Sequence, residues 1–139
     1  MRNKTRPKIF LLADDDPEDL EMLEESLLAA DPEIQLAMVR DGQQALEYLE
    51  SHGGEELPCF IVLDYKMPVF NAVEVLERIR KEPGLQAIPK VVWSTSSQPE
   101  HVRSCLEKGA LEYFIKPSRL SELKDITRRM LRICDEAAG

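Results

Sequence analysis

The sequence of 139 residues predicts one α/β domain built around a parallel sheet. Short apolar runs alternate five times with segments whose apolar residues recur at helical spacing, as expected for repeated βα units. The apolar runs lack polar alternation, which is typical of strands that helices cover on both faces. Hydrophobic residues make up 43% of the chain, enough for one core without metals or disulfides.

The apolar runs predict five strands in order along the chain. The first, residues 9–13, stops at Asp14. The third, residues 59–63, is the most convincing buried strand and also stops at a carboxylate, Asp64. The other expected strands cover residues 34–39, 91–93 and 113–115.

A helix is expected after each strand. The first follows Asp16-Pro17, an N-cap residue and a first-turn proline, and runs to about residue 30. The second follows Asp41-Gly42, and the third follows Met67-Pro68 and ends before residue 82. The fourth runs between Pro99 and Gly109, and the last covers about 121–137. Apolar stripes support the first three helices: Leu20, Leu23 and Leu27; Ala45, Leu46 and Leu49; and Val75, Leu76 and Ile79.

The charge balance limits the classes of partner. With 18 Lys and Arg against 26 Asp and Glu, the formal charge is −8, and no basic cluster favours nucleic acid or an anionic membrane. No apolar stretch approaches the roughly 20 residues that cross a bilayer, and the start of the chain does not resemble a secretory signal. We therefore expect a cytoplasmic protein, with residues 1–139 forming one module.

The cysteines and histidines do not indicate a metal centre. Cys59, Cys105 and Cys134 are odd in number and widely spaced, so we expect reduced, mostly buried thiols. His52 and His101 have no ligand spacing, and we expect both at the surface.

Polar residues collect where the strands end. In a parallel sheet these carboxyl ends meet at one edge, which brings together Asp14, Asp15, Asp64, Ser94 and Lys116. Carboxylates this close repel one another unless a cation neutralises them, and Mg²⁺ accepts one or two carboxylates together with other oxygens. An aspartate beside a metal and an ammonium group can attack phosphorus and become an aspartyl-phosphate. The edge of the sheet therefore predicts a Mg²⁺-dependent phosphoryl-transfer site.

Four motifs together resemble the receiver domain of two-component response regulators, over essentially the whole chain. The motifs are Leu12-Ala13-Asp14-Asp15-Asp16-Pro17, Val62-Leu63-Asp64-Tyr65-Lys66-Met67-Pro68, Ile88-Pro89 leading to Ser94, and Gly109-Ala110 through Tyr113 to Lys116-Pro117. The resemblance implies a doubly wound, flavodoxin-like (βα)5 sandwich with a five-stranded parallel sheet of order 2-1-3-4-5.

The resemblance also implies roles for individual residues. Asp64 matches the phospho-acceptor and Lys116 the lysine that contacts the phosphoryl group. The metal ligands are expected to be Asp15, Asp64 and the backbone carbonyl of Lys66, with Asp14 acting through water. Ser94 matches the switch hydroxyl, and Tyr113 matches the aromatic residue whose rotamer reports activation.

Three positions depart from the family pattern. Ser94 replaces the commoner threonine and keeps the hydroxyl. Ala72 stands where glycine is usual, so we expect neighbouring Asn71 to take any backbone strain. Ser118 replaces a bulky aromatic residue, which makes the surface near the last two helices less typical. Trp93 precedes Ser94, and strand alternation predicts that its ring lies beside the switch and outside the acid pocket.

The expected function is that of a phosphoryl acceptor and not of an enzyme. A sensor histidine kinase or a histidine phosphotransfer protein would donate the phosphoryl group, and the last two helices with the fifth strand would then contact a downstream protein. Three alternative functions compete with this one. A degenerate receiver would act only in docking. A haloacid-dehalogenase-type phosphohydrolase would carry its nucleophile after the first strand. A flavodoxin-like electron carrier would place its flavin phosphate beside Asp14, Asp15 and Asp16, whose charges would repel the phosphate.

Overall fold

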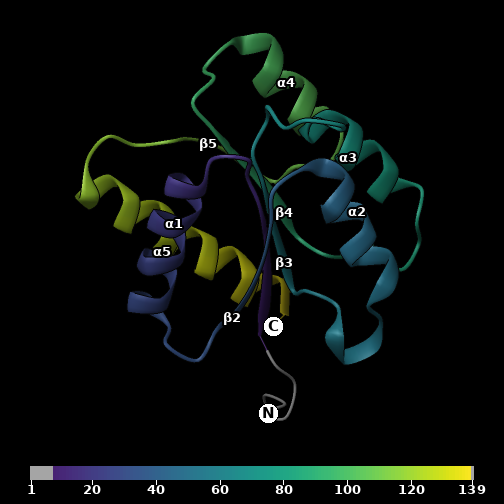
Figure 1. Cartoon of the computed structure of the whole chain (residues 1–139), viewed down its shortest axis with the longest axis horizontal. Coiled ribbons are helices and arrows are strands. Elements are labelled where there is room, and N and C mark those ends of the chain that lie inside the picture. The colour runs from purple at the N-terminus through teal and green to yellow at the C-terminus, as the bar shows by residue number, and fades with distance from the viewer. Residues whose placement is uncertain (1–7, 139) are drawn as a thin grey trace.

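The computed structural model describes residues 8–138, which form a central parallel sheet with helices on both faces (Figure 1). Its strands are β1 (Ile9–Ala13), β2 (Gln35–Val39), β3 (Phe60–Leu63), β4 (Lys90–Ser94) and β5 (Tyr113–Ile115). The sheet order is β2-β1-β3-β4-β5, and every pair is parallel. The predicted fold class and strand order are confirmed.

The helices divide between the two faces of the sheet. Their bounds are α1 (Pro17–Ala30), α2 (Gly42–Ser51), α3 (Ala72–Arg80), α4 (Pro99–Glu107) and α5 (Leu120–Ala138), and one 3-10 turn covers Gly54–Glu56. Helices α1 and α5 pack together on one face, and α2, α3 and α4 cover the other (Figure 1). We call these the α1/α5 face and the α2–α4 face. All predicted helices and strands are present, and their ends agree within one or two residues, except that α3 begins only at Ala72 and not directly after Pro68. The 3-10 turn carries no apolar pattern and was not predicted.

Alternation along the central strands supplies both cores. In β1, Phe10 and Leu12 belong to the core under α1 and α5, while Leu11 and Ala13 belong to the core under α2–α4. The strand β1 is buried at every position, as its unbroken apolar sequence predicts. By contrast, β2 lies at the edge of the sheet and is only partly covered.

The loop between β3 and α3 contains the backbone strain that the sequence suggested, but at a different residue. Asn71 has an ordinary φ of −79° and caps α3 through a reciprocal bond pair with Glu74. Ala72 is the first helical residue, whereas Val69 has a φ of 65°, in the left-handed region that a branched side chain rarely adopts. The prediction that Asn71 absorbs the strain is therefore wrong.

The same loop rests against the start of α2. A Cβ atom at Gly42 would overlap the carbonyl oxygen of Phe70, so this position has no room for a side chain. The Phe70 ring in turn lies under the Arg78 guanidinium, 4.2 Å from ring centroid to Cζ. These contacts fix the path of the chain after β3.

Two further predictions concern side chains away from the sheet edge. The thiols are free, with Cys105 and Cys134 buried and Cys59 half-buried, as expected. His52 and His101 lie at the surface as expected, but each is half-buried and stacks on a tyrosine, Tyr48 and Tyr65 respectively. Between residues 8 and 138, the helices are all too short or too polar to traverse a bilayer.

Candidate functional site

Backbone hydrogen bonds beyond the strand ends bring the predicted site residues together. The amide of Asp64 donates to the carbonyl of Ala13 at 2.9 Å, and the amide of Lys116 donates to the carbonyl of Ser94 at 2.8 Å. The ladder therefore continues past β3 and β5, and the residue that follows each strand is placed at the same edge of the sheet.

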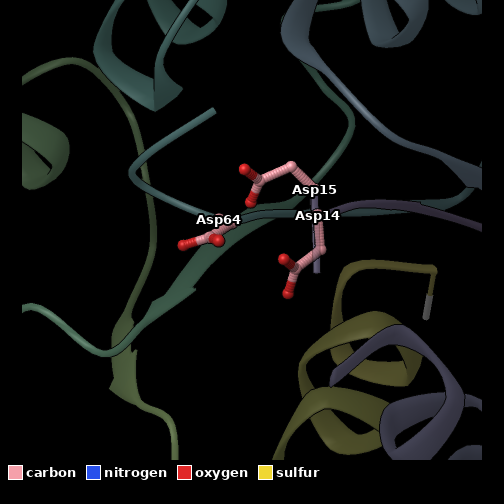
Figure 2. Close-up of side chains that lie close together, drawn as sticks. All are labelled: Asp14, Asp15 and Asp64. Atoms are coloured by element: carbon pink, nitrogen blue, oxygen red, sulfur yellow. The ribbon is translucent and has the colours of Figure 1, made fainter. Parts of the chain in front are cut away.

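Asp14, Asp15 and Asp64 form an acidic cluster at this edge (Figure 2). One carboxylate oxygen from each lies within 4.8 Å of the others. Asp14 is fully buried, Asp64 is 5% exposed, and Asp15 faces solvent. Asp16, next in sequence, instead caps α1 by accepting bonds from the amides of Glu18 and Asp19, as predicted.

Lys116 lies at the centre of a buried charge network. Its Nζ is 2.8 Å from Asp14 Oδ2, 2.7 Å from Asp19 Oδ2 and 3.2 Å from Asp64 Oδ2. The side chain is only 8% exposed. The sequence predicted that Lys116 lies beside Asp14 and Asp64, but not that it reaches Asp19, the third residue of α1.

The network shifts the ionisation of both charged partners. Burial and the charge of Asp14 raise the pKa of Asp64 to about 6, although Lys116 acts in the opposite direction. Burial by itself lowers the pKa of Lys116, but the bonds to Asp14 and Asp19 and the charges of Asp64 and Asp14 outweigh burial and raise it. Lys116 is therefore a permanent cation, while Asp64 exchanges protons close to neutrality.

Trp93 is part of this network, contrary to the expectation from the sequence. Its indole N–H donates a hydrogen bond to Asp14 Oδ2 at 3.1 Å, and Lys116 Nζ lies 5.4 Å from the ring centroid. Trp93 and Asp14 are both buried. Alternation did contain the signal, because Phe10, Leu12 and then Asp14 point to the α1/α5 face, where Trp93 also lies.

The pocket around Asp64 and Lys116 is open to solvent from one side. Its other lining residues are Asp15, Asp16, Asp19, Lys66, Met67, Pro68 and Thr95. Lys66 is thus placed beside the acidic cluster as expected. Among the described residues, Thr95 and not Ser94 contributes to the lining from the end of β4.

Ser94 instead begins a neutral network on the α2–α4 face. Its Oγ accepts a bond from the Ser96 amide at 3.2 Å, and the Tyr113 hydroxyl donates to the Ser96 carbonyl at 2.8 Å. Ser96 Oγ and His101 Nδ1 are 2.6 Å apart, and the His101 ring stacks on Tyr65 with centroids 4.0 Å apart. The network links Tyr65, which directly follows Asp64, to α4.

The donor set fits a small divalent cation. Three carboxylates contribute oxygens within 4.8 Å of one another, and two of them lie beside solvent or a solvent-open pocket. Mg²⁺ prefers such sites because it keeps several waters and uses few carboxylates. Lys116 pairs with Asp14, Asp19 and Asp64 at once, so one ammonium group balances only part of the charge of these three carboxylates, which leaves an attraction for a further cation.

Comparison with known proteins agrees with this geometry. The response regulator receiver domain family matches residues 10–128. The structure of the phosphorylated cyanobacterial phytochrome response regulator RcpA is similar with a TM-score of 0.84 and 29% identity, over 96% of this chain and 97% of RcpA. The Mn²⁺-bound form of response regulator Rcp1 gives a TM-score of 0.78 and 31% identity, over 88% of this chain and 91% of Rcp1.

Curated relatives include longer proteins. The two-component response regulator ORR7 of Oryza sativa subsp. japonica is 36% identical over 94 residues, which is 68% of this chain and 43% of ORR7. The chain spans about half the length of the curated relatives it matches. Because the family match covers the sheet, the acidic cluster and Lys116, this chain belongs to the receiver domains of two-component response regulators.

Proposed function

We propose that Asp64 accepts a phosphoryl group from a phosphohistidine on a sensor histidine kinase or a histidine phosphotransfer protein. One observation carries the proposal: the Asp64 carboxylate lies at the base of an open pocket, 3.2 Å from Lys116 Nζ and beside two further aspartates. The donor protein would present its phosphohistidine to Asp64 through the side of the pocket that is open to solvent.

The chain's own groups divide the chemistry among them. An Asp64 oxygen attacks phosphorus, the bond from phosphorus to the donor imidazole nitrogen breaks, and its electron pair stays on that nitrogen. Lys116 neutralises charge on the phosphoryl oxygens. Asp14, hydrogen-bonded by Trp93, holds Lys116 in place from the buried side.

Mg²⁺ would be held by Asp15, Asp64 and the backbone carbonyl of Lys66, with Asp14 acting through water. When bound, the ion would supply positive charge that offsets the repulsion between the carboxylates and the incoming phosphoryl group. Asp15 is suited to direct ligation because its carboxylate faces solvent and makes no ion pair among the described residues. The buried Asp14 is already bonded to Lys116, Trp93 and the amide of Asp16.

Incubation with acetyl phosphate and Mg²⁺, followed by intact mass measurement, tests the acceptor. The wild-type chain should gain one phosphoryl group that hydroxylamine removes. Asp64→Asn should gain none. The matched control is Asp16→Asn, which changes the N-cap residue of α1 at the edge of the pocket and should react like the wild type. An undiminished gain in Asp64→Asn would refute the assignment.

A Mg²⁺ titration tests the metal ligands separately. Trp93, the only tryptophan, contacts Asp14, so its fluorescence should report occupation of the cluster. Asp15→Asn should raise the Mg²⁺ concentration needed for half of the change by roughly tenfold or more, while Asp16→Asn should leave it nearly unchanged. Equal midpoints in the two variants would remove Asp15 from the ligand set.

The output is proposed to pass through contact with a downstream protein. The surface formed by α4, β5 and α5 exposes Leu106, Ile115 and Leu120, of which Leu120 is 73% accessible. Apolar side chains that group into one exposed patch are typical of surfaces that bind another protein. The neutral network from Tyr65 through His101 reaches this surface at α4, which gives phosphorylation a structural route to it.

A further inference from the structure

Two cysteines far apart in sequence meet at the opposite edge of the sheet from Asp64. Cys59 directly precedes β3, and Cys134 lies near the end of α5, on the α1/α5 face. Their sulfurs are 3.2 Å apart, and Cys134 Sγ is also 3.7 Å from the Cys59 carbonyl oxygen. Both thiols are free in this structure.

We propose that Cys59 and Cys134 form a reversible disulfide when the protein meets a peroxide. A disulfide requires a sulfur separation of about 2.05 Å, so the two sulfurs need to approach by only about 1 Å. The Cys59 amide is bonded to the Ile9 carbonyl at 2.8 Å, which fixes one side of the pair against β1. The approach can come from rotation of the side chains.

The two thiols differ in access, and this sets the order of the reaction. Cys59 is half-buried, so a small oxidant can reach it, whereas Cys134 is only 2% exposed. The hydrogen bond from Cys134 lowers the pKa of Cys59 against the effect of burial, and the nearby Lys8 cation helps. Cys59 is therefore the thiol that reacts first with an oxidant.

The chemistry balances with hydrogen peroxide as the oxidant. The Cys59 thiolate attacks one peroxide oxygen, the O–O bond breaks, and hydroxide leaves and is protonated to water. The Cys134 sulfur then attacks the sulfur of the Cys59 sulfenic acid, the S–O bond breaks, and a second water leaves. Two thiols are oxidised to one disulfide while one peroxide is reduced to two waters.

Cys105 offers an internal control within the same chain. It is fully buried on α4, under the other face of the sheet, and burial raises its pKa to about 11. It should therefore resist oxidation. Alkylation in denaturant should find three free thiols in the reduced protein and one after peroxide, with that one at Cys105.

Intact mass and peptide mapping of the peroxide-treated full chain test the proposal. We expect a loss of about 2 Da, a linked peptide pair containing Cys59 and Cys134, and full reversal by dithiothreitol. The rate should not depend on protein concentration, because the link is intramolecular. Cys105→Ser should behave like the wild type, and Cys134→Ser should stop at oxidised Cys59 without the loss of mass.

A thermal melt gives a second readout that needs no variant. Closing the chain between residues 59 and 134 should raise the melting temperature by roughly 5–15 °C, and dithiothreitol should abolish the increase. Asp64→Asn should show the same oxidation, so failure of this proposal and failure of phosphoryl acceptance are separate results. The peroxide dose is set as one that oxidises Cys59 in Cys134→Ser. The proposal would be overturned if the wild-type chain kept all three thiols at that dose, or if its disulfides formed only between molecules.

Discussion

The two faces of the sheet reach the acid pocket with different kinds of contact. On the α1/α5 face, Asp14, Lys116 and Trp93 form a buried network of charges and one indole donor. On the α2–α4 face, Ser96, Tyr113 and His101 form a half-buried network of hydroxyl, carbonyl and imidazole groups. The difference follows from alternation, since Trp93 and Ser94 are neighbours in β4 but point to opposite faces.

The comparison suggests a division of labour within one site. A buried ion pair costs several kcal/mol to break, because it leaves an uncompensated charge. A partly solvated neutral hydrogen bond costs about 1 kcal/mol, because water can replace it. We therefore expect the charged network to stay fixed and prepare Asp64 for reaction, while the neutral network rearranges and transmits the result.

The largest effect is expected from Lys116→Ala. Removal of the ammonium leaves the buried Asp14 and Asp64 without their cation, which should lower the free energy of unfolding by about 2–4 kcal/mol at pH 7 without Mg²⁺. Mg²⁺ should recover part of the loss and should bind at least as tightly as in the wild type. Urea denaturation measures both, with Lys108→Ala, which removes the more exposed pair with Glu77, as the control. Equal losses of unfolding free energy in Lys116→Ala and Lys108→Ala would show that the buried ion pairs of Lys116 contribute no more to stability than the exposed pair of Lys108.

Asp64→Asn should stabilise the metal-free protein at pH 7.5 by about 1–3 kcal/mol. The folded-state pKa of about 6 exceeds the ordinary value of 3.8, so the folded chain binds the proton more tightly than the unfolded chain. The contribution of Asp64 to stability therefore falls as the pH rises from about 4 to 6, and asparagine escapes this loss.

The measurement is urea denaturation of wild type and Asp64→Asn between pH 4 and 8 without Mg²⁺. The stability difference should be small at pH 4 and should reach its full value above pH 6. Mg²⁺ should reduce it again at pH 7.5 by binding the ionised carboxylate. A difference that is constant over this pH range would refute the raised pKa.

Trp93→Phe should have an intermediate effect. Phenylalanine keeps an aromatic ring in the core but cannot donate to Asp14, so the buried carboxylate loses one bond at a cost of about 1–2 kcal/mol. Lys116→Ala/Trp93→Phe should lose less than the sum of the two single variants, because both act on Asp14. Additive losses in a double-mutant cycle would show that Trp93 contributes only packing.

The smallest effect on stability is expected on the other face. His101→Phe retains the ring beside Tyr65 but removes the bond to Ser96, at a cost below about 1 kcal/mol. Its effect should appear instead in the response, as a weaker change in binding of a downstream protein upon phosphorylation. A loss comparable to that of Lys116→Ala would contradict the proposed division between the faces.

Much of this arrangement could be predicted from the sequence. Periodicity located the strands and helices because it depends on local burial, and the rule for parallel sheets placed Asp14, Asp64 and Lys116 together. Applied one step further, alternation would also have put Trp93 on the face of Asp14.

Other features had no readable signal. The stack of His101 on Tyr65 depends on the tilt of α4 over the loop after β3, which is a tertiary property. The positive φ of Val69 depends on how a loop of eight residues, 64–71, must reach α3. Valine rarely adopts a positive φ, so the residue type gives no sign of this conformation. The contact of Cys59 with Cys134 requires the length and direction of α5.

The contact between Gly42 and Phe70 has a consequence for genetics. A single added methyl group at position 42 would push the loop that carries Lys66 and Met67 away from the acidic cluster, although every charged residue would remain. Such an allele would retain the complete set of acidic and basic residues, and we expect it to accept a phosphoryl group more slowly than the wild type. Inspection of the motif residues alone would classify this allele as intact, because Gly42 lies outside the motifs.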